Sequence, residues 1–348
     1  MQRILVTGGA GFIGSHTTFN LLQKGYKVII VDSYANSSES SILNLKSLIK
    51  KVNSSLIKNL SFYRGDIRQK DFVEEIFSRS LIDGSPIKGV IHFAGLKAVA
   101  ESVKDPLKYW DYNFVGTLRL LEIMDKFDCR TIIFSSSATI YGFPQKSLIN
   151  ENSNINPINP YGFNKSTIEI LLKNLFDSNP NSWRVANLRY FNPIGAHDTG
   201  LIGENPKGIP NNIFPFINKV ASKEINELKI FGKDWDTHDG TGVRDYIHVM
   251  DLAEGHILSL EFLMKNDSQI INLNLGTGKG TSVLELVKIF EKINNVKVPY
   301  VFTKRREGDV GNLVADNSLA TSILNWQPKR NLYEMCAHGW RWQLNSMK

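Results

Sequence analysis

The chain is poor in cysteine, because Cys129 and Cys336 are the only two among its 348 residues. Two cysteines cannot build a disulfide framework or a cysteine metal site. The seven histidines are scattered and include no His-Glu-x-x-His pair, so we expect no dedicated metal site. The longest apolar stretches, such as residues 28–31 and 89–95, fall far short of the ~20 residues that cross a bilayer. The sequence therefore predicts no transmembrane helix and no disulfide scaffold.

The positive charge is in small excess and is spread along the chain. Lysine and arginine number 41 against 34 acidic residues, a formal net charge of +7. A nucleic-acid-binding protein usually concentrates its basic residues on one face or tail. Neither a nucleic acid nor a membrane is therefore an expected partner, while a small anionic substrate is compatible with this surface. Residues 1–7 run directly into glycines without the apolar core of a secretory signal, and we expect a cytoplasmic location.

Short β-rich runs alternate with helical patterns over the first 190 residues. Such alternation predicts an α/β fold, a Rossmann-like doubly wound parallel sheet with helices on both faces. The expected strands are residues 3–7, 27–32, 60–64, 89–93, 130–135 and 184–188, and the expected helices are 14–24, 115–127 and 161–176. The segment 37–59 reads equally well as a linker or as a surface helix.

The sequence changes character after residue 190, where Gly, Pro and Asn become frequent. We therefore expect two domains, a doubly wound domain over residues 1–190 and a smaller C-terminal α/β domain over 191–348. Part of the second domain is expected to pack back on the first sheet.

A glycine-rich motif follows the first expected strand and opens the first expected helix. Gly8, Gly11 and Gly14 form Gly-x-x-Gly-x-x-Gly. Glycine permits the tight turn and the close approach of a pyrophosphate, which the helix N-terminus attracts. The alternative to dinucleotide binding is that these glycines serve only the geometry of a sharp turn. Asp32 ends the second strand, where a carboxylate binds a ribose 2′-hydroxyl and repels a 2′-phosphate, so the combination favours NAD over NADP.

Two further strand ends belong to the same edge of the predicted sheet. Asp66 closes the third strand, where the adenine end of a dinucleotide would lie. Phe93 ends the fourth strand and is followed by two small residues, Ala94 and Gly95, which would let the backbone pass close to the cofactor. Taken singly, each of these is also an ordinary turn.

A serine-rich strand end and a Tyr-x-x-x-Lys pair form the candidate catalytic group. Tyr161 and Lys165 lie four apart on one face of a helix, and Ser137 precedes Tyr161 by 24 residues. An ammonium on that face is expected to stabilise a phenolate and to lower the tyrosine pKa from ~10. Ser137 can bind the substrate oxygen, Tyr161 can take its proton, and Lys165 can hold both the phenol and a ribose. A Tyr-x-x-x-Lys pair alone is weak evidence for a catalytic site, because many helices carry one on a solvated face.

Longer motifs make the sequence resemble the UDP-glucose 4-epimerase (UDP-galactose 4-epimerase) family of extended short-chain dehydrogenases/reductases over nearly its whole length. The matching stretches are residues 6–9, 65–68, 91–99, 134–139, 188–193, 208–212, 242–249 and 305–309. The resemblance implies NAD as a tightly held cofactor, a UDP-hexose as substrate and a homodimer as assembly.

The resemblance also implies roles for individual residues. Cofactor contacts fall on Gly8, Gly11, Phe12, Ile13, Gly14, Asp32, Asn36, Asp66, Ile67, Phe93, Ala94, Gly95, Lys97, Asn113, Tyr161, Lys165 and Tyr190. Substrate contacts fall on Lys97, Ser137, Tyr161, Asn192, Asn211, Asn212, Phe231, Arg244, Arg306, Asp309 and Leu313. One departure occurs at Tyr112, where the family often has an asparagine, so a cofactor contact from that position is left open, while Asn113 matches the family.

The implied reaction is reversible epimerisation at C4 of UDP-galactose and UDP-glucose, through a transient 4-keto sugar and NADH. Because Leu313 occupies a position that gates the sugar pocket in this family, some activity on UDP-N-acetylhexosamines is a further hypothesis; plain packing is its alternative. A uronate epimerase or decarboxylase of the same fold, and a non-catalytic NAD-binding regulator, remain open. A 4,6-dehydratase is disfavoured because Ala138 and Thr139 stand where an Asp-Glu pair is usual.

Overall fold

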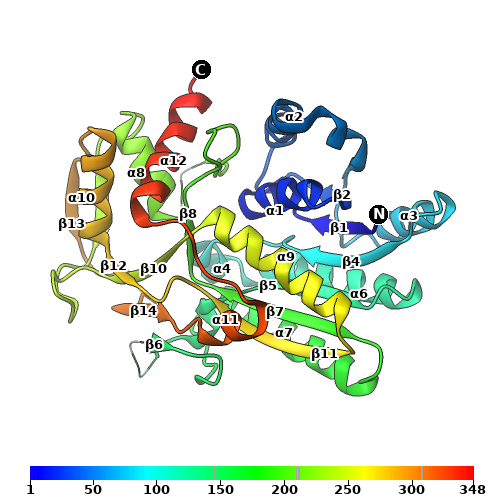
Figure 1. Cartoon of the computed structure of the whole chain (residues 1–348). Coiled ribbons are helices and arrows are strands. Elements are labelled where there is room, and N and C mark those ends of the chain that lie inside the picture. Colours follow the sequence, from blue (N-terminus) through cyan, green and yellow to red (C-terminus); the bar gives the residue numbers. More distant parts are fainter. Residues whose placement is uncertain (145, 147, 209, 211, 307–308) are drawn as a thin grey trace.

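A seven-stranded parallel sheet forms the centre of the protein in the computed structural model, which describes residues 1–144, 146, 148–208, 210, 212–306 and 309–348 (Figure 1). The strand order is β11-β7-β5-β4-β1-β2-β3, and every neighbouring pair is parallel. The strands are β1 (Arg3–Thr7), β2 (Lys27–Asp32), β3 (Leu60–Arg64), β4 (Ile87–His92), β5 (Thr131–Ser137), β7 (Arg184–Tyr190) and β11 (Gln269–Leu275). The six predicted strands are all present, and the predicted fold class is confirmed.

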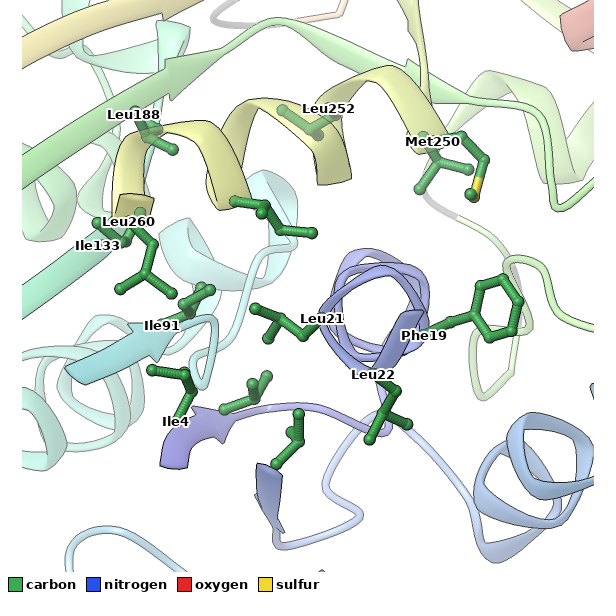
Figure 2. Packing of buried hydrophobic residues seen from close by; sticks show 14 of the residues in the cluster. Ile4, Phe19, Leu21, Leu22, Ile91, Ile133, Leu188, Met250, Leu252 and Leu260 are labelled. Carbon is green, nitrogen blue, oxygen red and sulfur yellow. The ribbon is translucent and has the colours of Figure 1, made fainter. Parts of the chain in front are cut away.

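Helices cover both faces of this sheet because its strands are apolar on both sides. In β1, Ile4 and Val6 face one buried cluster, whereas Leu5 faces the other. The first face packs against α1 (Phe12–Gln23), α2 (Glu39–Asn53) and α9 (Val249–Lys265), and the second against α3 (Lys70–Ile82), α6 (Gly116–Lys126) and α7 (Pro160–Ser178). Figure 2 shows the first cluster, with α1 lying beside α9 above the strands. Each fully buried aliphatic side chain contributes roughly 1.5–3 kcal/mol to folding.

The segment after β2 is a helix and not a linker. In α2, Ile42, Leu45, Leu48 and Ile49 are buried while the remaining face carries serine and lysine. The helical alternative for residues 37–59 is therefore confirmed, with the short 3₁₀ helix η1 (Ser54–Asn59) completing the segment.

A second, smaller layer is built mainly by the C-terminal half of the chain. Its five-stranded sheet contains β12 (Gly280–Ser282), β10 (Val243–His248), β14 (Asn312–Ala315), β6 (Leu148–Ile149) and, beside β10, β8 (Asn192–Ile194). A two-stranded sheet pairs β9 (Leu228–Phe231) with β13 (Tyr300–Thr303). The helices α8 (Ile213–Ala221), α10 (Val283–Asn294) and α12 (Leu332–Ser346) bury a separate apolar cluster with β9 and β10, and α11 (Ser318–Leu324) packs near β11.

The chain crosses between the two layers in both directions. Two elements of the C-terminal half join the first layer: β11 is a strand of the large sheet, and α9 packs on that sheet. In the other direction, β6 comes from the N-terminal half and pairs with β14 in the smaller sheet. Short elements at the rim complete the fold: α4 (Val99–Lys104), α5 (Pro106–Tyr109), the π-helical turn η2 (Trp110–Val115) and η3 (Ala138–Tyr141). In the described part of the chain no helix is both long and apolar enough to cross a membrane.

Candidate active site

The turn between β1 and α1 has a shape that only glycine permits. Gly8 has φ +70°, and a Cβ there would lie 2.7 Å from the backbone nitrogen of Ala94. A Cβ at Gly14 would overlap the carbonyl oxygen of Gly8, because the first turn of α1 packs directly on the strand end. Gly11 is less confined, with the same oxygen 3.2 Å away. The free N–H groups of the α1 N-terminus therefore face an open cleft that can accept a phosphate.

Asp32 lies at the neighbouring strand end and is already fixed in place. Its buried carboxylate accepts hydrogen bonds from the backbone N–H of Ala10 at 3.0 Å, that of Tyr34 at 2.9 Å and the Ser37 hydroxyl at 2.8 Å. These bonds aim a negative charge at the cleft beside the glycine turn. The arrangement suits a ribose diol and opposes a 2′-phosphate.

The cleft runs along the carboxyl ends of the strands, as expected for a doubly wound sheet. All the predicted cofactor residues line it except Asn113. Asn113 is buried behind the turn that follows β4: its amide oxygen accepts from the Leu96 N–H at 2.7 Å, and its amide nitrogen donates to the Leu96 carbonyl at 3.0 Å. It therefore supports the turn that carries Ala94 and Gly95.

An ion-pair network stands at the end of the cleft near β3. Arg68 donates to Asp66 at 2.6 Å and also pairs with Asp111. Burial would raise the pKa of Asp66, but the hydrogen bonds and charge of Arg68 outweigh burial and lower it. Tyr112 lines the cleft, and the Arg68 guanidinium lies 3.6 Å from its ring centre.

The three predicted catalytic residues converge near the other end. Ser137 ends β5, while Tyr161 and Lys165 lie in the first turns of α7, which begins after the Asn159 cap and Pro160. Lys165 donates to the Ser135 carbonyl at 2.6 Å, and its nitrogen is 5.8 Å from the Tyr161 ring centre. The Ser137 hydroxyl accepts from that of Thr139 at 3.0 Å. Tyr161 and Lys165 both line the cleft.

The expected low pKa of Tyr161 is wrong for this structure. Burial raises the pKa of Tyr161 to about 12, and the neighbouring Ser137 hydroxyl, which favours the phenolate, opposes this only partly. Burial also lowers the pKa of Lys165 to about 7, although the charge of Glu169 acts in the opposite direction. Desolvation disfavours the charged form of each group, and it is the largest effect on both pKa values.

Apart from Lys97, Ser137 and Tyr161, the predicted substrate residues that the structure describes lie on the second layer. Arg244 on β10 lies 4.0 Å from the Asp309 carboxylate, and it pairs in register with Leu313 on β14. The Arg306 guanidinium stands 4.0 Å from the ring centre of Phe231 at the end of β9. Asn192 begins β8, and Asn212 immediately precedes α8 without a capping bond from its side chain. Asn211 lies outside the described residues.

One carboxylate that the sequence did not single out joins the two sets of residues. Glu204 lines the cleft and accepts from Lys97 at 2.7 Å and from Asn212 at 3.0 Å. Its neighbours Gly203, Asn205 and Pro206 also line the cleft. No periodic pattern or local spacing marks this loop, so only the folded chain identifies it. In the described part of the chain no group of three or more His, Cys, Asp or Glu side chains is arranged to hold a metal ion.

The chain is similar to known proteins in both sequence and structure. The family model described as GDP-mannose 4,6 dehydratase matches residues 5–338. UDP-glucose 4-epimerase of Bacillus subtilis (strain 168) is 48% identical over 344 residues, which are 99% of this chain and 97% of that protein. Among solved structures, a UDP-glucose 4-epimerase from Bifidobacterium longum in complex with NAD+ and UDP has a TM-score of 0.92 at 43% identity, covering 99% of both chains. One from Stenotrophomonas maltophila, with bound NAD and formylated UDP-arabinopyranose, has a TM-score of 0.93 at 41% identity, covering 100% of this chain and 99% of that one.

The parallel sheet, the glycine turn and the Ser-Tyr-Lys group define a dinucleotide-dependent enzyme of the extended short-chain dehydrogenase/reductase class. Within that class, the chain belongs to the UDP-glucose 4-epimerase family.

Proposed function

We propose that this protein is an NAD-dependent isomerase that interconverts UDP-galactose and UDP-glucose at C4. The observation that carries the proposal is the convergence of Tyr161 and Lys165, beside Ser137, on one cleft with the glycine turn and Asp32. Full-length similarity to UDP-glucose 4-epimerases supports the same reaction.

The residues present fit an NAD molecule. A Cβ at Gly8 or Gly14 would clash with the backbone of Ala94 or Gly8, so glycine is needed for the tight turn that presents the α1 N-terminus to a pyrophosphate, and the fixed carboxylate of Asp32 matches an unphosphorylated ribose. The residues proposed to hold NAD are Gly8, Gly11, Phe12, Ile13, Gly14, Asp32, Asn36, Asp66, Ile67, Phe93, Ala94, Gly95, Lys97, Tyr161, Lys165 and Tyr190. We propose that Asn113 acts through the turn it supports, and that Tyr112 is an additional contact at the adenine end.

Tyr161 is the proposed base and acid of the reaction. When bound, oxidised NAD supplies a hydride acceptor for C4 and a positive charge that favours the Tyr161 phenolate, which is otherwise held protonated by burial. The phenolate takes the proton of the 4-hydroxyl, and the resulting phenol later returns a proton to the same oxygen when C4 is reduced from its other face. Ser137 holds the reacting oxygen, and the Lys165 ammonium stabilises the phenolate.

The second layer is the proposed site of the UDP group. Arginine donors bind diphosphate oxygens in pairs and remain charged, which suits Arg244 and Arg306, while Phe231 can support the uracil ring. The proposed substrate residues are Lys97, Ser137, Tyr161, Asn192, Asn211, Asn212, Phe231, Arg244, Arg306, Asp309 and Leu313. We accordingly assign NAD binding to residues 1–190 and UDP-sugar binding to 191–348, with α9 and β11 packing back on the large sheet.

UDP-N-acetylhexosamines are proposed as additional substrates. Leu313 is nearly buried and packs with Ala138, the residue after Ser137. A leucine at this place occupies less space than a tyrosine would. A solved UDP-Glc/GlcNAc 4-epimerase from Campylobacter jejuni has a TM-score of 0.82 at 32% identity, covering 99% of this chain and 100% of that one.

We further propose a cytoplasmic homodimer. Val103, Leu107, Phe163 and Ile170 are exposed apolar side chains on α4, α5 and α7, which lie side by side. An apolar surface of this kind is typical of an interface between subunits. Both cysteines are free and buried, as suits a reducing compartment.

The proposed reaction is tested with UDP-galactose that carries deuterium at C4. Hydride removal and return within one site predicts UDP-glucose that retains the deuterium at C4, measured by NMR and mass spectrometry. Loss of the label to solvent would contradict the proposal. A C6 methyl signal would instead indicate a 4,6-dehydratase, which needs acid-base groups that Ala138 does not supply.

A further inference from the structure

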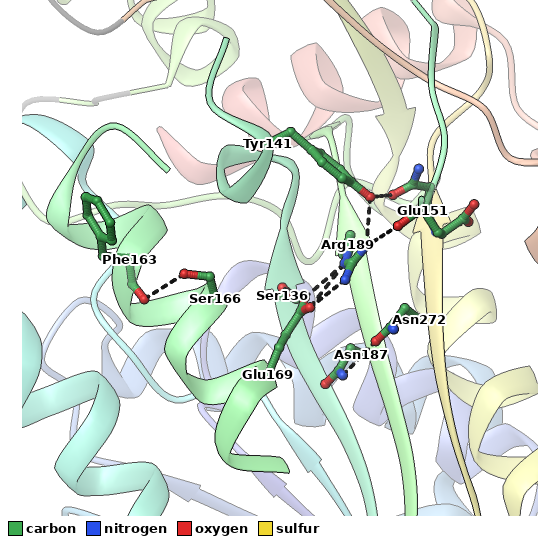
Figure 3. Close-up of polar contacts among 10 residues, drawn as sticks. Ser136, Tyr141, Glu151, Phe163, Ser166, Glu169, Asn187, Arg189 and Asn272 are labelled. Atoms are coloured by element: carbon green, nitrogen blue, oxygen red, sulfur yellow. Dashed lines mark hydrogen bonds and ion pairs between the residues drawn. The ribbon is translucent and has the colours of Figure 1, made fainter. Parts of the chain in front are cut away.

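A buried ion pair lies directly behind the catalytic residues and has no role in the chemistry described so far. Glu169 and Arg189 are only 6% and 2% exposed, and the Arg189 guanidinium donates to the Glu169 carboxylate at 2.6 and 3.0 Å (Figure 3). Removing two charges from water is costly, so a buried pair contributes little net stability. Its position therefore calls for an explanation other than fold stability.

Glu169 lies on the catalytic helix in register with the catalytic residues. On α7, Tyr161, Lys165 and Glu169 follow one another at intervals of four, which places them on the same buried face. The charge of Glu169 opposes the effect of burial on the pKa of Lys165. Lys165 itself has a backbone carbonyl, and no carboxylate, as its hydrogen-bond partner.

Glu169 also fixes the strand that holds the other catalytic groups. Its carboxylate accepts from the Ser136 hydroxyl at 2.5 Å. Ser136 stands between Ser135, whose carbonyl binds Lys165, and Ser137 at the reacting oxygen. Because side chains alternate along a strand, Ser136 binds Glu169, whereas the hydroxyls of Ser135 and Ser137 contact other partners, those of Tyr190 and Thr139.

Arg189 connects this carboxylate to the second layer. It donates to the Tyr141 hydroxyl at 3.1 Å and to the Glu151 carbonyl at 3.0 Å, next to β6. A buried carboxylate needs an opposite charge with good geometry, and Arg189 supplies it.

The remaining titratable groups around Lys165 do not supply a negative charge. His92 on β4 is buried, and burial lowers its pKa to about 3, so it is neutral. Tyr161 and Tyr190 are buried phenols whose pKa values are raised by burial. Tyr109 on α5 is another phenol with a raised pKa, again chiefly from burial, and Lys97 across the cleft is a cation. Among the described groups packed against Lys165, Glu169 is therefore the only carboxylate.

We propose that Glu169 is a positioning residue for proton transfer at Tyr161: its buried charge keeps the Lys165 ammonium protonated, and its bond to Ser136 holds the strand end that presents Ser135 and Ser137. Arg189 is the counter-charge that allows Glu169 to remain there. This inference rests on the proposed function, since it concerns the same proton transfer.

The test compares Glu169→Gln, which removes the charge at constant size, with Glu169→Asp, which keeps it. Glu151→Gln is the matched control, because it removes a neighbouring acid of the same network without touching Glu169. In Glu169→Gln, the pKa that defines the upper limb of the kcat/KM pH profile is expected to be lower by about one unit or more. This corresponds to a tenfold weaker affinity of Lys165 for its proton. Glu169→Asp and Glu151→Gln are expected to keep the upper limb of the parent.

A second readout does not depend on turnover. NMR titration of protein labelled with ¹³C at the lysine ε-carbons, assigned with Lys165→Arg, reports the ionisation of Lys165 directly. Its midpoint is expected to fall in Glu169→Gln and to stay near that of the parent in Glu169→Asp. If the parent protein failed to epimerise, the proposed function would fail, while this titration would still decide the role of Glu169.

An unchanged Lys165 midpoint in a folded Glu169→Gln protein would overturn the inference. Because that variant leaves a buried Arg189 without its counter-charge, Glu169→Gln combined with Arg189→Met is the second variant, which removes both charges. The double variant is expected to show a downward shift of the Lys165 midpoint that is smaller than in Glu169→Gln, because the like charge of Arg189 is removed as well. A change in unfolding midpoint alone, with Lys165 unmoved, would show that the pair is only structural.

Discussion

At the scale of single residues, Tyr161 carries the proton of the proposed reaction. Tyr161→Phe is expected to retain NAD, because the glycine turn and Asp32 are untouched, but to lose about 10²–10⁴-fold in turnover. Turnover is followed by NMR, and bound dinucleotide is measured after denaturation. Tyr246→Phe is the matched control, since Tyr246 is a buried phenol on β10 outside the cleft. Full activity of Tyr161→Phe would refute the assignment of the base.

Leu313 is the residue expected to govern tolerance of N-acetylated sugars. A tyrosine there adds volume in the cluster that contains Ala138, the residue after Ser137, and a misfit of one small group in a substrate pocket changes discrimination by roughly 1–3 kcal/mol. Leu313→Tyr is therefore expected to lower the rate on UDP-N-acetylgalactosamine relative to UDP-galactose by about tenfold or more. Leu313→Met, which conserves volume, serves as the control. An unchanged ratio in Leu313→Tyr would mean that the residue only packs.

Single residues also show where sequence reasoning stops. The Ser137, Tyr161 and Lys165 group was predicted from spacing, and in the structure Tyr161 and Lys165 line the cleft with the Ser137 hydroxyl beside Tyr161. The pKa of Tyr161 was predicted in the wrong direction because spacing does not report burial, which dominates here. Glu204 and Arg189 were not assigned roles either, since their partners are distant in the chain.

At the scale of elements, the contact between β1 and α1 depends on Gly14. Gly14→Ala places a methyl group against the Gly8 carbonyl, so the helix must shift. We expect a loss of about 1–3 kcal/mol in unfolding free energy and weaker NAD binding. Both are measured by urea denaturation and by dinucleotide titration. Gly11→Ala, with more room, should cost clearly less, and equal losses in the two variants would contradict this account of the turn.

The helices and strands near a motif were more predictable than those formed by distant pairing. The six strands from β1 to β7 in the large sheet follow local apolar runs, and α2 follows its Ile and Leu spacing. That part of the C-terminal half packs back on the large sheet was expected, but its identity as α9 and β11 was not. Nothing local in residues 269–275 specifies β7 as the neighbour; the fit of α9 against α1 brings them there.

At the scale of the whole molecule, the proposed dimer depends on the apolar surface of α5 and α7. The variant Leu107→Glu combined with Ile170→Glu places two charges on that surface and is expected to yield a monomer in size-exclusion chromatography with light scattering. Ile82→Glu, at the exposed end of α3, is the matched control and should leave the assembly unchanged. A parent protein that is monomeric at micromolar concentration would contradict the proposed dimer.

Acid is expected to destabilise the whole fold through buried neutral histidines. Burial lowers the pKa of His16 and His92 to about 3 and that of His256 to about 4. The unfolded chain binds these protons near pH 6.5, so stability is lost as the pH falls below that value. Each histidine contributes roughly 1.4 kcal/mol per pH unit until its folded pKa is reached.

Urea unfolding at pH 7.5 and 5.5 measures this loss. His256→Leu removes one titrating group and should lose less stability between the two pH values than the parent. An equal loss in both proteins would show that His256 is not part of the acid response.

The most direct test of the proposed function is proton NMR of the purified protein with UDP-galactose and no added NAD. We expect the anomeric signal of UDP-glucose to appear until the two sugars reach equilibrium, because no redox equivalents are consumed. A parallel sample of UDP-N-acetylgalactosamine reports the effect of Leu313. Absence of conversion in both samples, even after NAD is added, would contradict the assignment of this chain as a UDP-hexose 4-epimerase.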